Sequence, residues 1–421
     1  MMSKFSIRSI KGTQDILPDQ SSQWQSLEEA IRNFMGHYGY QEIRTPTFEQ
    51  TDLFIRSMGK ETDIVSKEMY SWTDQGGENL TLKPELTAPV ARAYIQHNLG
   101  GKSPLNKLYY IDTLFRRERP QKGRYRQFNQ FGIEAFGSEY PEIDAEVITL
   151  AISIFNKMGI KELKLKLNSI GSPQCRIDYR ETILDFLKPH IADLSEISQT
   201  RFENNPMRIL DTKVPHEIEI LKNLPNIADC WTNEDKDHFE EVCSLLDSTG
   251  IKYELTPRLV RGLDYYTKTT FEITSSALGA QDAICGGGRY DGLVESLGGK
   301  PTPGIGFAAG MERILLAMNN VESTSNSKQV YIVGLGNAVR PTVLKLAEEL
   351  RQSSITTEFD VLRRSIKAQL REANKSGAKY AILIGDQELE ARQAELKDLS
   401  TGDQKKIELN NLVEHIISLP F

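Results

Sequence analysis

The chain has 421 residues, of which 39% are hydrophobic and 26% charged, and a formal net charge of −7. This length allows two or three domains with their own cores, and the composition is that of an ordinary globular protein. No apolar run reaches the length of a membrane span, and the first residues lack the apolar core of a signal peptide. We therefore expect a cytoplasmic protein without a membrane partner, in which any nucleic acid must meet local basic patches.

The cysteines do not form a recognisable metal or disulfide pattern. They are Cys175, Cys230, Cys243 and Cys285, with no CxxC spacing and no histidine at zinc spacing. This pattern favours reduced thiols and no protein-ligated metal.

Strand and helix signals divide the first three quarters of the chain. Residues 1–167 and 258–320 are rich in strand signals interrupted by Gly and Pro, whereas residues 171–253 show helical periodicity, as in YRETILDFLKPHIADL. We predict one α+β domain over residues 1–322, with a helical insertion at about 171–256.

A polar stretch, NNVESTSNSK, separates this part from the rest, and we place a linker at residues 323–328. Beyond it strand and helix patterns alternate (QVYIVGLG, RPTVLKLAEELRQ, TTEFDVL, SIKAQLREANKSG, AKYAILIG). The alternation predicts a small α/β domain over residues 329–421 with a largely parallel sheet.

The stretch LTLKPELTAPVARAYIQHN places two polar residues between a strand and a helix. We expect the helix to start near Ala88, so that Glu85 and Thr87 stand at its N-terminus. Helix capping is then an alternative to ligand binding for both residues.

The stretch FRRERPQKGRYRQFNQFGIEAFG predicts two strands joined by a basic loop. Six basic residues lie between Arg116 and Arg126, including Lys122, against one acid, Glu118. In the second strand, one face carries Phe131, Ile133 and Ala135, and the other carries Phe128, Gln130, Gly132 and Glu134. The second face could form the floor of a site for a flat ring, and a solvated charged hairpin is the alternative.

Two further stretches combine a strand with unusual residues at its end. RGLDYYTKTTFEI places Arg261, Tyr265 and Tyr266 before an alternating strand. AICGGGRYDGLVESLGG holds three glycines, Gly286 to Gly288, which either let backbone approach a ligand or form a bulge.

The stretch PTPGIGFAAGMERILLAM predicts a strand leading into a helix with Arg313 in its first turn, where a cation opposes the helix dipole. Arg116, Arg261 and Arg313 have no evident carboxylate partners in the sequence, which favours a polyphosphate ligand. No Walker sequence is present. GIGFAA and GLGNAV match the dinucleotide fingerprint poorly, so an oxidoreductase is a weak alternative.

Together these stretches resemble the class II aminoacyl-tRNA synthetases. GYQEIRTPTFE is similar to their first motif, FRRERP through GIEAFG to the second, and GIGFAAGMERI to the third. RGLDYY and GGGRYDGL resemble the histidyl-tRNA synthetase family in particular. KGTQDILP near the start and the C-terminal α/β domain extend the resemblance over almost the whole chain. The resemblance implies an antiparallel-sheet catalytic domain with a helical insertion, plus a C-terminal α/β anticodon-binding domain. KPELT departs slightly from the usual Arg-Pro-Glu pattern at Lys83 and Leu86.

The resemblance implies a histidine–tRNA ligase, which joins histidine to the α-phosphate of ATP and then to its tRNA. Arg116 and Arg261 would be catalytic. The implied histidine-binding residues are Glu85, Thr87, Arg116, Gln130, Glu134, Arg261, Tyr265, Tyr266 and Tyr290. The implied ATP-binding residues are Arg116, Glu118, Arg124, Phe128 and Arg313. Mg²⁺ would accompany ATP.

Further partners are also implied by the resemblance. Arg119 and Gln121 would contact the histidine tRNA near its acceptor end, and the protein would be a homodimer. Basic residues recur every four positions near the second C-terminal helix, at Arg363, Lys367, Arg371, Lys375 and Lys379. They are either an RNA surface or a solvated face. A rival is the non-catalytic regulatory paralogue of histidine biosynthesis, which lacks the anticodon-binding domain and usually degrades RGLDYY.

Overall fold

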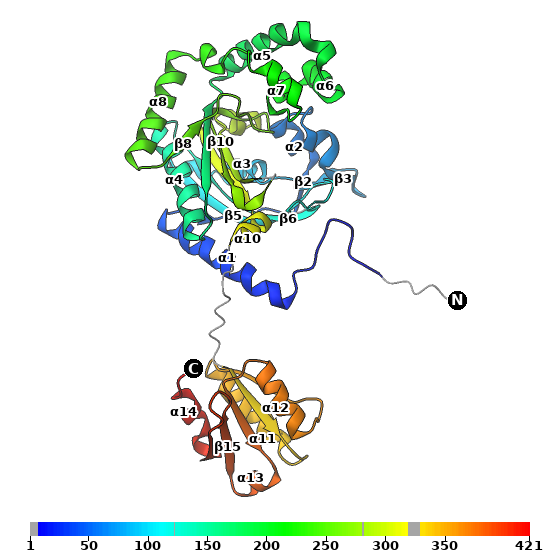
Figure 1. Cartoon of the computed structure of the whole chain (residues 1–421), viewed down its shortest axis with the longest axis vertical. Coiled ribbons are helices and arrows are strands. Elements are labelled where there is room, and N and C mark those ends of the chain that lie inside the picture. Colours follow the sequence, from blue (N-terminus) through cyan, green and yellow to red (C-terminus); the bar gives the residue numbers. More distant parts are fainter. Residues whose placement is uncertain (1–6, 122, 280–281, 319–328) are drawn as a thin grey trace, which may run out of the picture. The chain divides into compact units, whose positions relative to one another are not determined.

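The computed structural model describes residues 7–121, 123–279, 282–318 and 329–421. The chain divides into two compact units, Met1–Glu322 and Ser323–Phe421 (Figure 1). The predicted linker at 323–328 and Lys122 of the basic loop lie outside the described residues. Within the described ranges, no helix has both the length and the apolar character needed to cross a bilayer.

An eight-stranded sheet forms the centre of the first unit. Its strands, in spatial order, are β1 (Gln41–Glu42), β5 (Asn106–Phe115), β6 (Gln127–Phe136), β11 (Gly304–Gly310), β10 (Ala283–Arg289), β9 (Thr267–Ser275), β7 (Leu163–Ser169) and β8 (Tyr253–Leu255). The pairs from β5 to β7 are antiparallel, and the outer pairs β1–β5 and β7–β8 are parallel. The predicted antiparallel-sheet α+β fold is confirmed.

The β5–β6 hairpin sets the register of this sheet. Ile111 lies opposite Phe131, and Asp112 lies opposite Gln130. Phe131 and Ile133 are fully buried in the apolar core, whereas Phe128 and Gln130 line a cavity. The predicted division of this strand into an apolar and a polar face is therefore confirmed, because successive side chains point to opposite faces.

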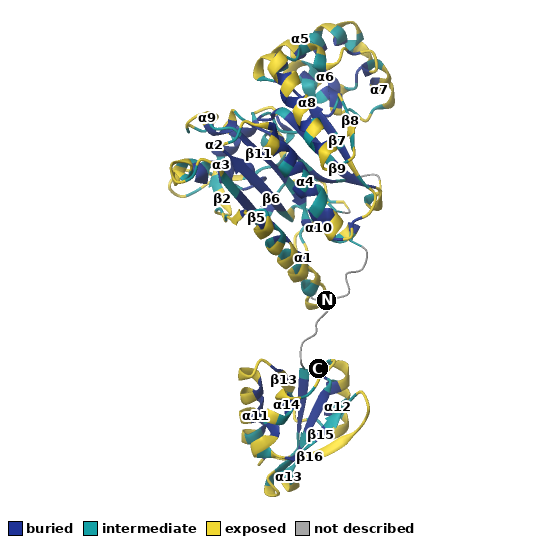
Figure 2. Cartoon of the chain, turned by 90° about the vertical axis from the view of Figure 1, so that its left-hand side faces the viewer, coloured by how far each residue is buried: buried dark blue, intermediate teal, exposed yellow. Residues whose placement is uncertain are grey.

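Helices cover both faces of the sheet and bury two apolar clusters (Figure 2). One cluster holds side chains of α1 (Pro18–His37), α4 (Pro141–Lys157), α8 (Asn233–Ser248) and α10 (Met311–Ala317). The other holds side chains of α2 (Thr51–Met58), α3 (Thr87–Gln96), α5 (Pro173–Leu187), α7 (Pro215–Leu221) and α9 (Leu293–Ser296). Neighbouring residues Tyr109 and Tyr110 of β5 belong to different clusters, because they point to opposite faces.

A small second sheet lies near the first motif. Its order is β2 (Phe48–Gln50), β4 (Asn79–Leu82) and β3 (Tyr70–Thr73), all antiparallel. A π-helix spans Ile64–Glu68. Short 3-10 helices in the chain are Leu99–Gly101, Lys188–Asp193, Pro206–Asp211, Ile227–Cys230, Ser276–Leu278 and Leu409–Asn411.

The segment between β7 and β8 is helical, with α5, α6 (Glu196–Asn204), α7 and α8 in turn. Hydroxyl caps start three of these helices: Ser172 accepts from Cys175 N, Ser195 from Ser198 N, and Thr232 forms a capping box with Asp235. The predicted helical range ended at about 256, but Tyr253–Leu255 forms β8 beside β7. The three-residue strand is too short to show a period.

The second unit contains one mixed sheet with helices around it. Its sheet order is β13 (Thr356–Phe359), β12 (Gln329–Gly334), β14 (Tyr380–Ile384), β15 (Gln393–Asp398) and β16 (Gln404–Glu408). The helices are α11 (Arg340–Gln352), α12 (Ile366–Lys375), α13 (Asp386–Glu390) and α14 (Leu412–Ile417). The three predicted strands are parallel, and the sequence interpretation missed the antiparallel strands β15 and β16.

Candidate active site

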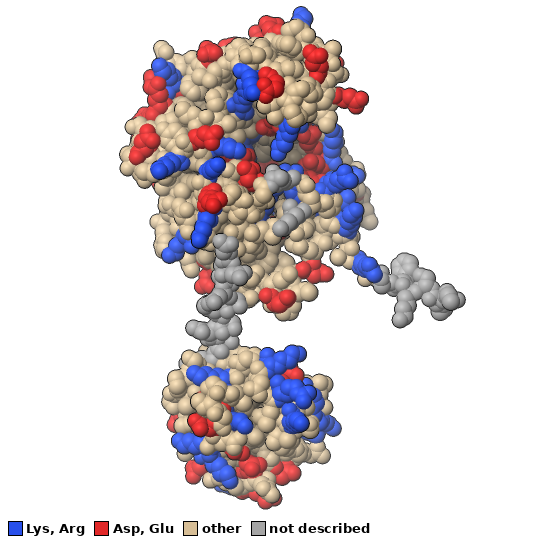
Figure 3. Space-filling model, in the orientation of Figure 1, with Lys and Arg blue, Asp and Glu red and all other residues tan. Residues whose placement is uncertain are grey.

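A cavity of about 860 Å³ opens in the first unit. Figure 3 shows this face of the unit hollowed, with basic side chains around the hollow. Twelve of the residues predicted from the sequence line it, namely Glu85, Thr87, Arg116, Glu118, Arg124, Phe128, Gln130, Arg261, Tyr265, Tyr266, Tyr290 and Arg313. Residues distant in sequence thus share one cavity.

Glu85 caps helix α3. Its carboxylate accepts hydrogen bonds from the backbone N–H groups of Thr87 (2.8 Å) and Ala88 (3.0 Å). Burial raises the pKa of Glu85 to about 7, although these N–H groups favour its charged form. The capping interpretation is confirmed for Glu85. Thr87 makes a different contact, because its hydroxyl donates to Glu134.

Glu134 does not itself line the cavity, but it lies directly behind three residues that do, Thr87, Tyr110 and Tyr290, and their hydroxyl groups surround it. Its Oε1 accepts from Thr87 (2.8 Å) and Tyr110 (3.2 Å), and its Oε2 accepts from Tyr290. A Cβ at position 306 would lie 2.1 Å from Oε2, so Gly306 leaves room for the carboxyl group. Burial raises the pKa of Glu134 to about 8 despite these hydrogen bonds.

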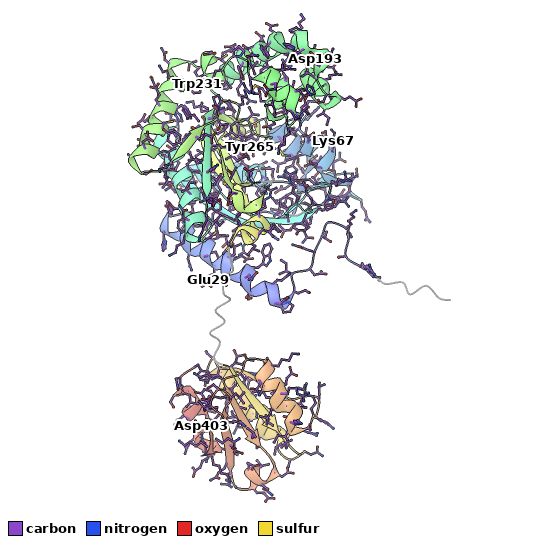
Figure 4. All side chains as sticks on the ribbon, in the orientation of Figure 1. Glu29, Lys67, Asp193, Trp231, Tyr265 and Asp403 are labelled. Carbon is purple, nitrogen blue, oxygen red and sulfur yellow. The ribbon has the colours of Figure 1, made fainter. Side chains whose placement is uncertain are left out.

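Three tyrosine rings form the wall next to this carboxyl group. The ring centroid of Tyr265 lies 4.7 Å from that of Tyr266 and 5.7 Å from that of Tyr290. In the view of Figure 4, Tyr265 lies near the middle of the first unit, with Asp193 and Trp231 of the helical segment towards its top. The three rings and their hydroxyl groups together form an enclosed, polar part of the cavity surface.

Arg261 also lines the cavity, beside the glycines of β10. Its NH1 donates to Glu272 at 3.1 Å. A Cβ at position 286 would lie 1.7 Å from its NH2, so Gly286 makes room for the guanidinium group. Gly288 falls at a register shift between β10 and β9, with φ at +158°. At Gly286 the missing side chain leaves space for the Arg261 guanidinium group rather than for a ligand. At Gly288 the alternative prediction, a bulge, describes the structure.

Arg116 and Arg124 lie on either side of one carboxylate. Arg116 NH1 is 3.8 Å and Arg124 NH1 is 3.3 Å from Glu118. Arg116 also donates to Pro84 O at 2.8 Å and lies over the Phe128 ring, 5.3 Å from its centroid. The expectation that Arg116 and Arg261 lack carboxylate partners is wrong, because Glu118 and Glu272 approach them.

Arg313 stands in the first turn of α10, as predicted. Its NH1 donates to Ala283 O at 2.5 Å and its Nε to Gly123 O at 3.4 Å. The guanidinium therefore connects the turn of the basic loop with the start of β10. Burial and the nearby Arg124 lower its pKa.

The two residues predicted to contact tRNA lie on the basic loop and are exposed. Arg119 and Gln121 do not line the cavity. Gln121 and Arg124 exchange two backbone hydrogen bonds of 3.1 and 2.9 Å, which close the tip of this loop. An exposed loop beside the cavity leaves both side chains accessible from solvent.

Basic side chains also gather on the second unit, over α12 (Figure 3). Lys367, Arg371 and Lys375 belong to α12 and are exposed. Arg363 precedes the helix, with φ at +57°, and Lys379 lies between the helix and β14. The predicted stripe is thus helical for three of its five members.

The sequence interpretation missed several cavity residues. Glu272 and Tyr110 read as ordinary strand positions, and their roles depend on pairing with Arg261 and Glu134. The helical segment contributes a whole side of the cavity, with Arg201, Arg208, Leu210, Asp211, Thr212 and Lys213. No local sequence pattern predicts that these residues line the cavity, because their position there depends on how the helical segment packs in the folded chain.

Comparisons with known proteins agree across the whole chain. A sequence model described as histidyl-tRNA synthetase matches residues 12–314, and one described as anticodon binding domain matches residues 329–419. A histidine–tRNA ligase of Acetivibrio thermocellus is 46% identical over 409 residues, covering 96% of this chain and 98% of that protein. The chain belongs to the histidyl-tRNA synthetase family.

Solved structures give the same result. The apo histidyl-tRNA synthetase of S. aureus is 40% identical, with a TM-score of 0.83, and the match covers 98% of this chain and 100% of that chain. A Bacillus halodurans structure is described as an ATP phosphoribosyltransferase regulatory subunit/histidyl-tRNA synthetase. It is 23% identical, with a TM-score of 0.65 over 91% of this chain and 99% of that chain, which shows the shared fold alone.

Proposed function

We propose that the chain is a histidine–tRNA ligase, which activates L-histidine with ATP and transfers it to the 3′ end of its tRNA. One observation carries the proposal: a single cavity is lined by the hydroxyl groups that surround the buried Glu134 and by several arginines. A buried polar floor suits a small polar ring, and fixed guanidinium groups suit phosphate oxygens. Near-full-length similarity to a histidine–tRNA ligase supports the same activity.

Histidine would bind at the buried end. In this proposal its imidazole ring meets Glu134 through the polar groups around it, which are Gln130, Tyr265, Tyr266 and Tyr290. Its α-ammonium group would meet Glu85 and Thr87. A cation next to Glu85 would favour the ionised carboxylate, and so offset the burial that raises its pKa.

ATP would bind at the arginine end. In the first step a carboxylate oxygen of histidine bonds to the α-phosphorus, and pyrophosphate leaves. Arg116 and Arg261 would hold the reacting groups and stabilise the developing charge, because fixed cations need no reorganisation during the reaction. Arg124 and Glu118 would contact the nucleotide, and adenine would lie between Phe128 and Arg313.

Mg²⁺ would enter with ATP and neutralise phosphate charge. The residues present fit this arrangement, because Mg²⁺ in such sites takes one or two carboxylates besides phosphate and water. Glu118 and Glu272 line the cavity, and both are already close to arginines. Because these arginines already offset the two carboxylates, Mg²⁺ would be held mainly by the phosphates of ATP and by water.

In the second step a terminal ribose hydroxyl of tRNA attacks the histidyl carbonyl carbon, and AMP leaves. Arg119 and Gln121 would contact the acceptor end of the tRNA. The second unit, matched by the anticodon-binding family, would contact RNA with the exposed basic residues of α12.

A second copy of the chain would cover the first-motif region. Phe48 and Trp72 are 51% and 41% exposed and contact each other edge to face, with ring centroids 6.0 Å apart. Exposed aromatic pairs of this kind are common at protein interfaces. We also infer a cytoplasmic location, which the four free thiols support.

The decisive experiment is histidine-dependent exchange of labelled pyrophosphate into ATP. We expect exchange with histidine and none when histidine is omitted. A regulatory paralogue could bind histidine but would catalyse no exchange. Thermal shifts with ATP, histidine and NAD in separate samples would test the oxidoreductase alternative, for which only NAD should stabilise the protein.

A further inference from the structure

The loop that carries Tyr265 and Tyr266 has no helix or strand of its own. Residues 261–266 precede β9 and are assigned to no regular element. Backbone groups in such a loop must find partners outside a helix or sheet. The hydrogen-bond partners of this loop therefore determine the positions of Tyr265 and Tyr266.

The partners come from the helical segment. Arg176, near the start of α5, donates through NH1 to Asp264 O and Tyr266 O, both at 2.9 Å. These two carbonyls flank Tyr265. One guanidinium nitrogen therefore fixes the backbone on both sides of the residue whose ring contacts Tyr266 and Tyr290. Hydrogen bonds from a charged donor are stronger than those between neutral groups.

The contact also compensates for an unfavourable position of Arg176 in its helix. Ser172 and Pro173 start α5, so Arg176 lies close to the positive end of the helix dipole. A cation there is unfavourable for the helix by itself. Two carbonyl oxygens of the tyrosine loop compensate for it.

A second contact from the same segment holds the Asp264 side chain. Asn205 Nδ2, between α6 and the following 3-10 helix, donates to Asp264 Oδ1 at 2.9 Å. On the other side of this carboxylate a Cβ at position 59 would lie 2.6 Å from Oδ2, so Gly59 leaves it space. The helical segment therefore forms hydrogen bonds with both the backbone of this loop, through Arg176, and the Asp264 side chain, through Asn205.

The segment also contacts a second part of the cavity lining. Arg208 NH2 lies 3.0 Å from Asp63, which directly precedes the π-helix. At the end of that π-helix Glu68 O accepts the backbone N–H of Arg117, the residue after Arg116. The helical segment therefore contacts the tyrosine loop directly and reaches the backbone next to Arg116 only through the π-helix.

We infer that Arg176 is a positioning residue for the amino-acid site, through which the helical insertion fixes Tyr265 and Tyr266. The inference rests on the proposed function, which places histidine against these tyrosines. Arg176 itself would touch no substrate. Its loss would let the loop shift, and small misplacements of binding groups have large effects on substrate positioning.

The test compares Arg176→Met, Arg176→Lys and a control, Arg180→Met, in the full-length protein. Arg180 lies one turn further along α5 and is exposed. Histidine-dependent pyrophosphate exchange is measured with each substrate varied in turn, and thermal melts check the fold. We expect Arg176→Met to raise the KM for histidine about tenfold or more while the KM for ATP changes by less than about twofold.

Arg176→Lys should recover part of the loss, because an ammonium group carries three donors and can still reach a carbonyl. Arg180→Met should behave like the parent. A merely structural role would lower kcat through a smaller folded fraction, leave both KM values unchanged, and overturn the inference. An unchanged histidine KM in Arg176→Met would also overturn it. No exchange in the parent protein would instead reject the proposed function, and this inference with it.

Discussion

The two ends of the cavity are built in opposite ways. At the buried end, Glu134 is 1% exposed and both of its oxygens accept hydrogen bonds from hydroxyl groups. At the other end, the side chains of Arg116 and Arg261 are each 21% exposed and keep donors beyond their contacts with Glu118 and Glu272. One end is a closed hydrogen-bond network, and the other is a group of partly neutralised cations.

This difference indicates a division of labour. A closed network of buried polar groups rejects a ligand that cannot satisfy it, so it supplies selection. Fixed cations stabilise charge that develops during the reaction, so they supply rate. Mutations at the two ends should therefore change different kinetic constants.

The largest effect should follow Arg261→His. The substitution removes the guanidinium that Gly286 accommodates, whereas Glu272 keeps Lys166 at 3.9 Å. We expect the single-turnover rate of adenylate formation to fall about 10²-fold or more. The control is Arg258→His, which alters another arginine lining the cavity. A rate within a few-fold of the parent, or an equal loss in the control, would contradict the assignment of Arg261.

Glu134→Gln should affect selection rather than rate. An amide replaces one of the two accepting oxygens by a donor and cannot ionise, so the three hydroxyls must reorient. We expect the KM for histidine to rise about tenfold or more, with a much smaller change for ATP. Pyrophosphate exchange with each substrate varied measures both values.

The matched control for Glu134→Gln is Glu312→Gln. Glu312 is a buried carboxyl group that lines the same cavity and accepts from Asn129 N at 2.8 Å. It should not reproduce the histidine effect. Equal increases in both KM values after Glu134→Gln would show that this residue supports the whole cavity rather than the histidine end.

Charge reversal on α12 should affect tRNA charging, which we assign to the second unit, without affecting histidine activation in the first unit. In Lys367→Glu, Arg371→Glu and Lys375→Glu combined, we expect tRNA charging efficiency to fall roughly tenfold at moderate salt, with a shallower salt dependence. Pyrophosphate exchange should stay unchanged, because all twelve cavity-lining candidates lie in the first unit. Reversal of exposed Lys405 and Lys406 on β16 is the control. Unchanged charging would remove α12 from the RNA surface.

The last prediction concerns the pH dependence of stability rather than a kinetic constant. Burial raises the pKa of Glu134 from its ordinary value of 4.5 to about 8. Between these values the folded protein holds a proton that the unfolded chain has released, so stability falls as pH rises. Within this window one carboxyl group lowers the free energy of unfolding by about 1.4 kcal/mol per pH unit.

Melting temperatures of the parent and Glu134→Gln from pH 5 to pH 9 test this prediction. The difference, parent minus mutant, should decrease as pH rises and level off above about pH 8. A difference that stays constant with pH would mean that Glu134 is already ionised in the ligand-free protein at the start of this range.

Local patterns predicted much of the site. The alternation in β6 predicted which side chains enter the core and which face the cavity, because the strand period is two. The Glu85 cap was predictable in the same way, since a carboxylate before a helix finds free N–H groups. Each of these predictions depends on neighbours within a few residues.

Other features could not be predicted from local patterns. The antiparallel strand β15, with half-buried charged positions such as Glu395 and Asp398, carries too few apolar residues to mark it. The partner of Arg261 is Glu272, eleven residues away on β9, and their contact depends on the loop between them. The space at Gly286 and Gly306 is occupied by side chains from other parts of the chain.

By itself the sequence determined most of the elements, the polar face of β6, the basic loop and the family resemblance, because these depend on residue spacing. Only the tertiary structure decided which charges meet. The pairing of Tyr110, Thr87 and Tyr290 around Glu134 brings together three distant elements of the chain. The contact of Arg176 with the tyrosine loop joins residues 88 and 90 positions apart. Hydrogen bonds require donor and acceptor to lie within a few ångströms of each other. The number of residues between two groups does not give that distance, because it depends on how the chain folds.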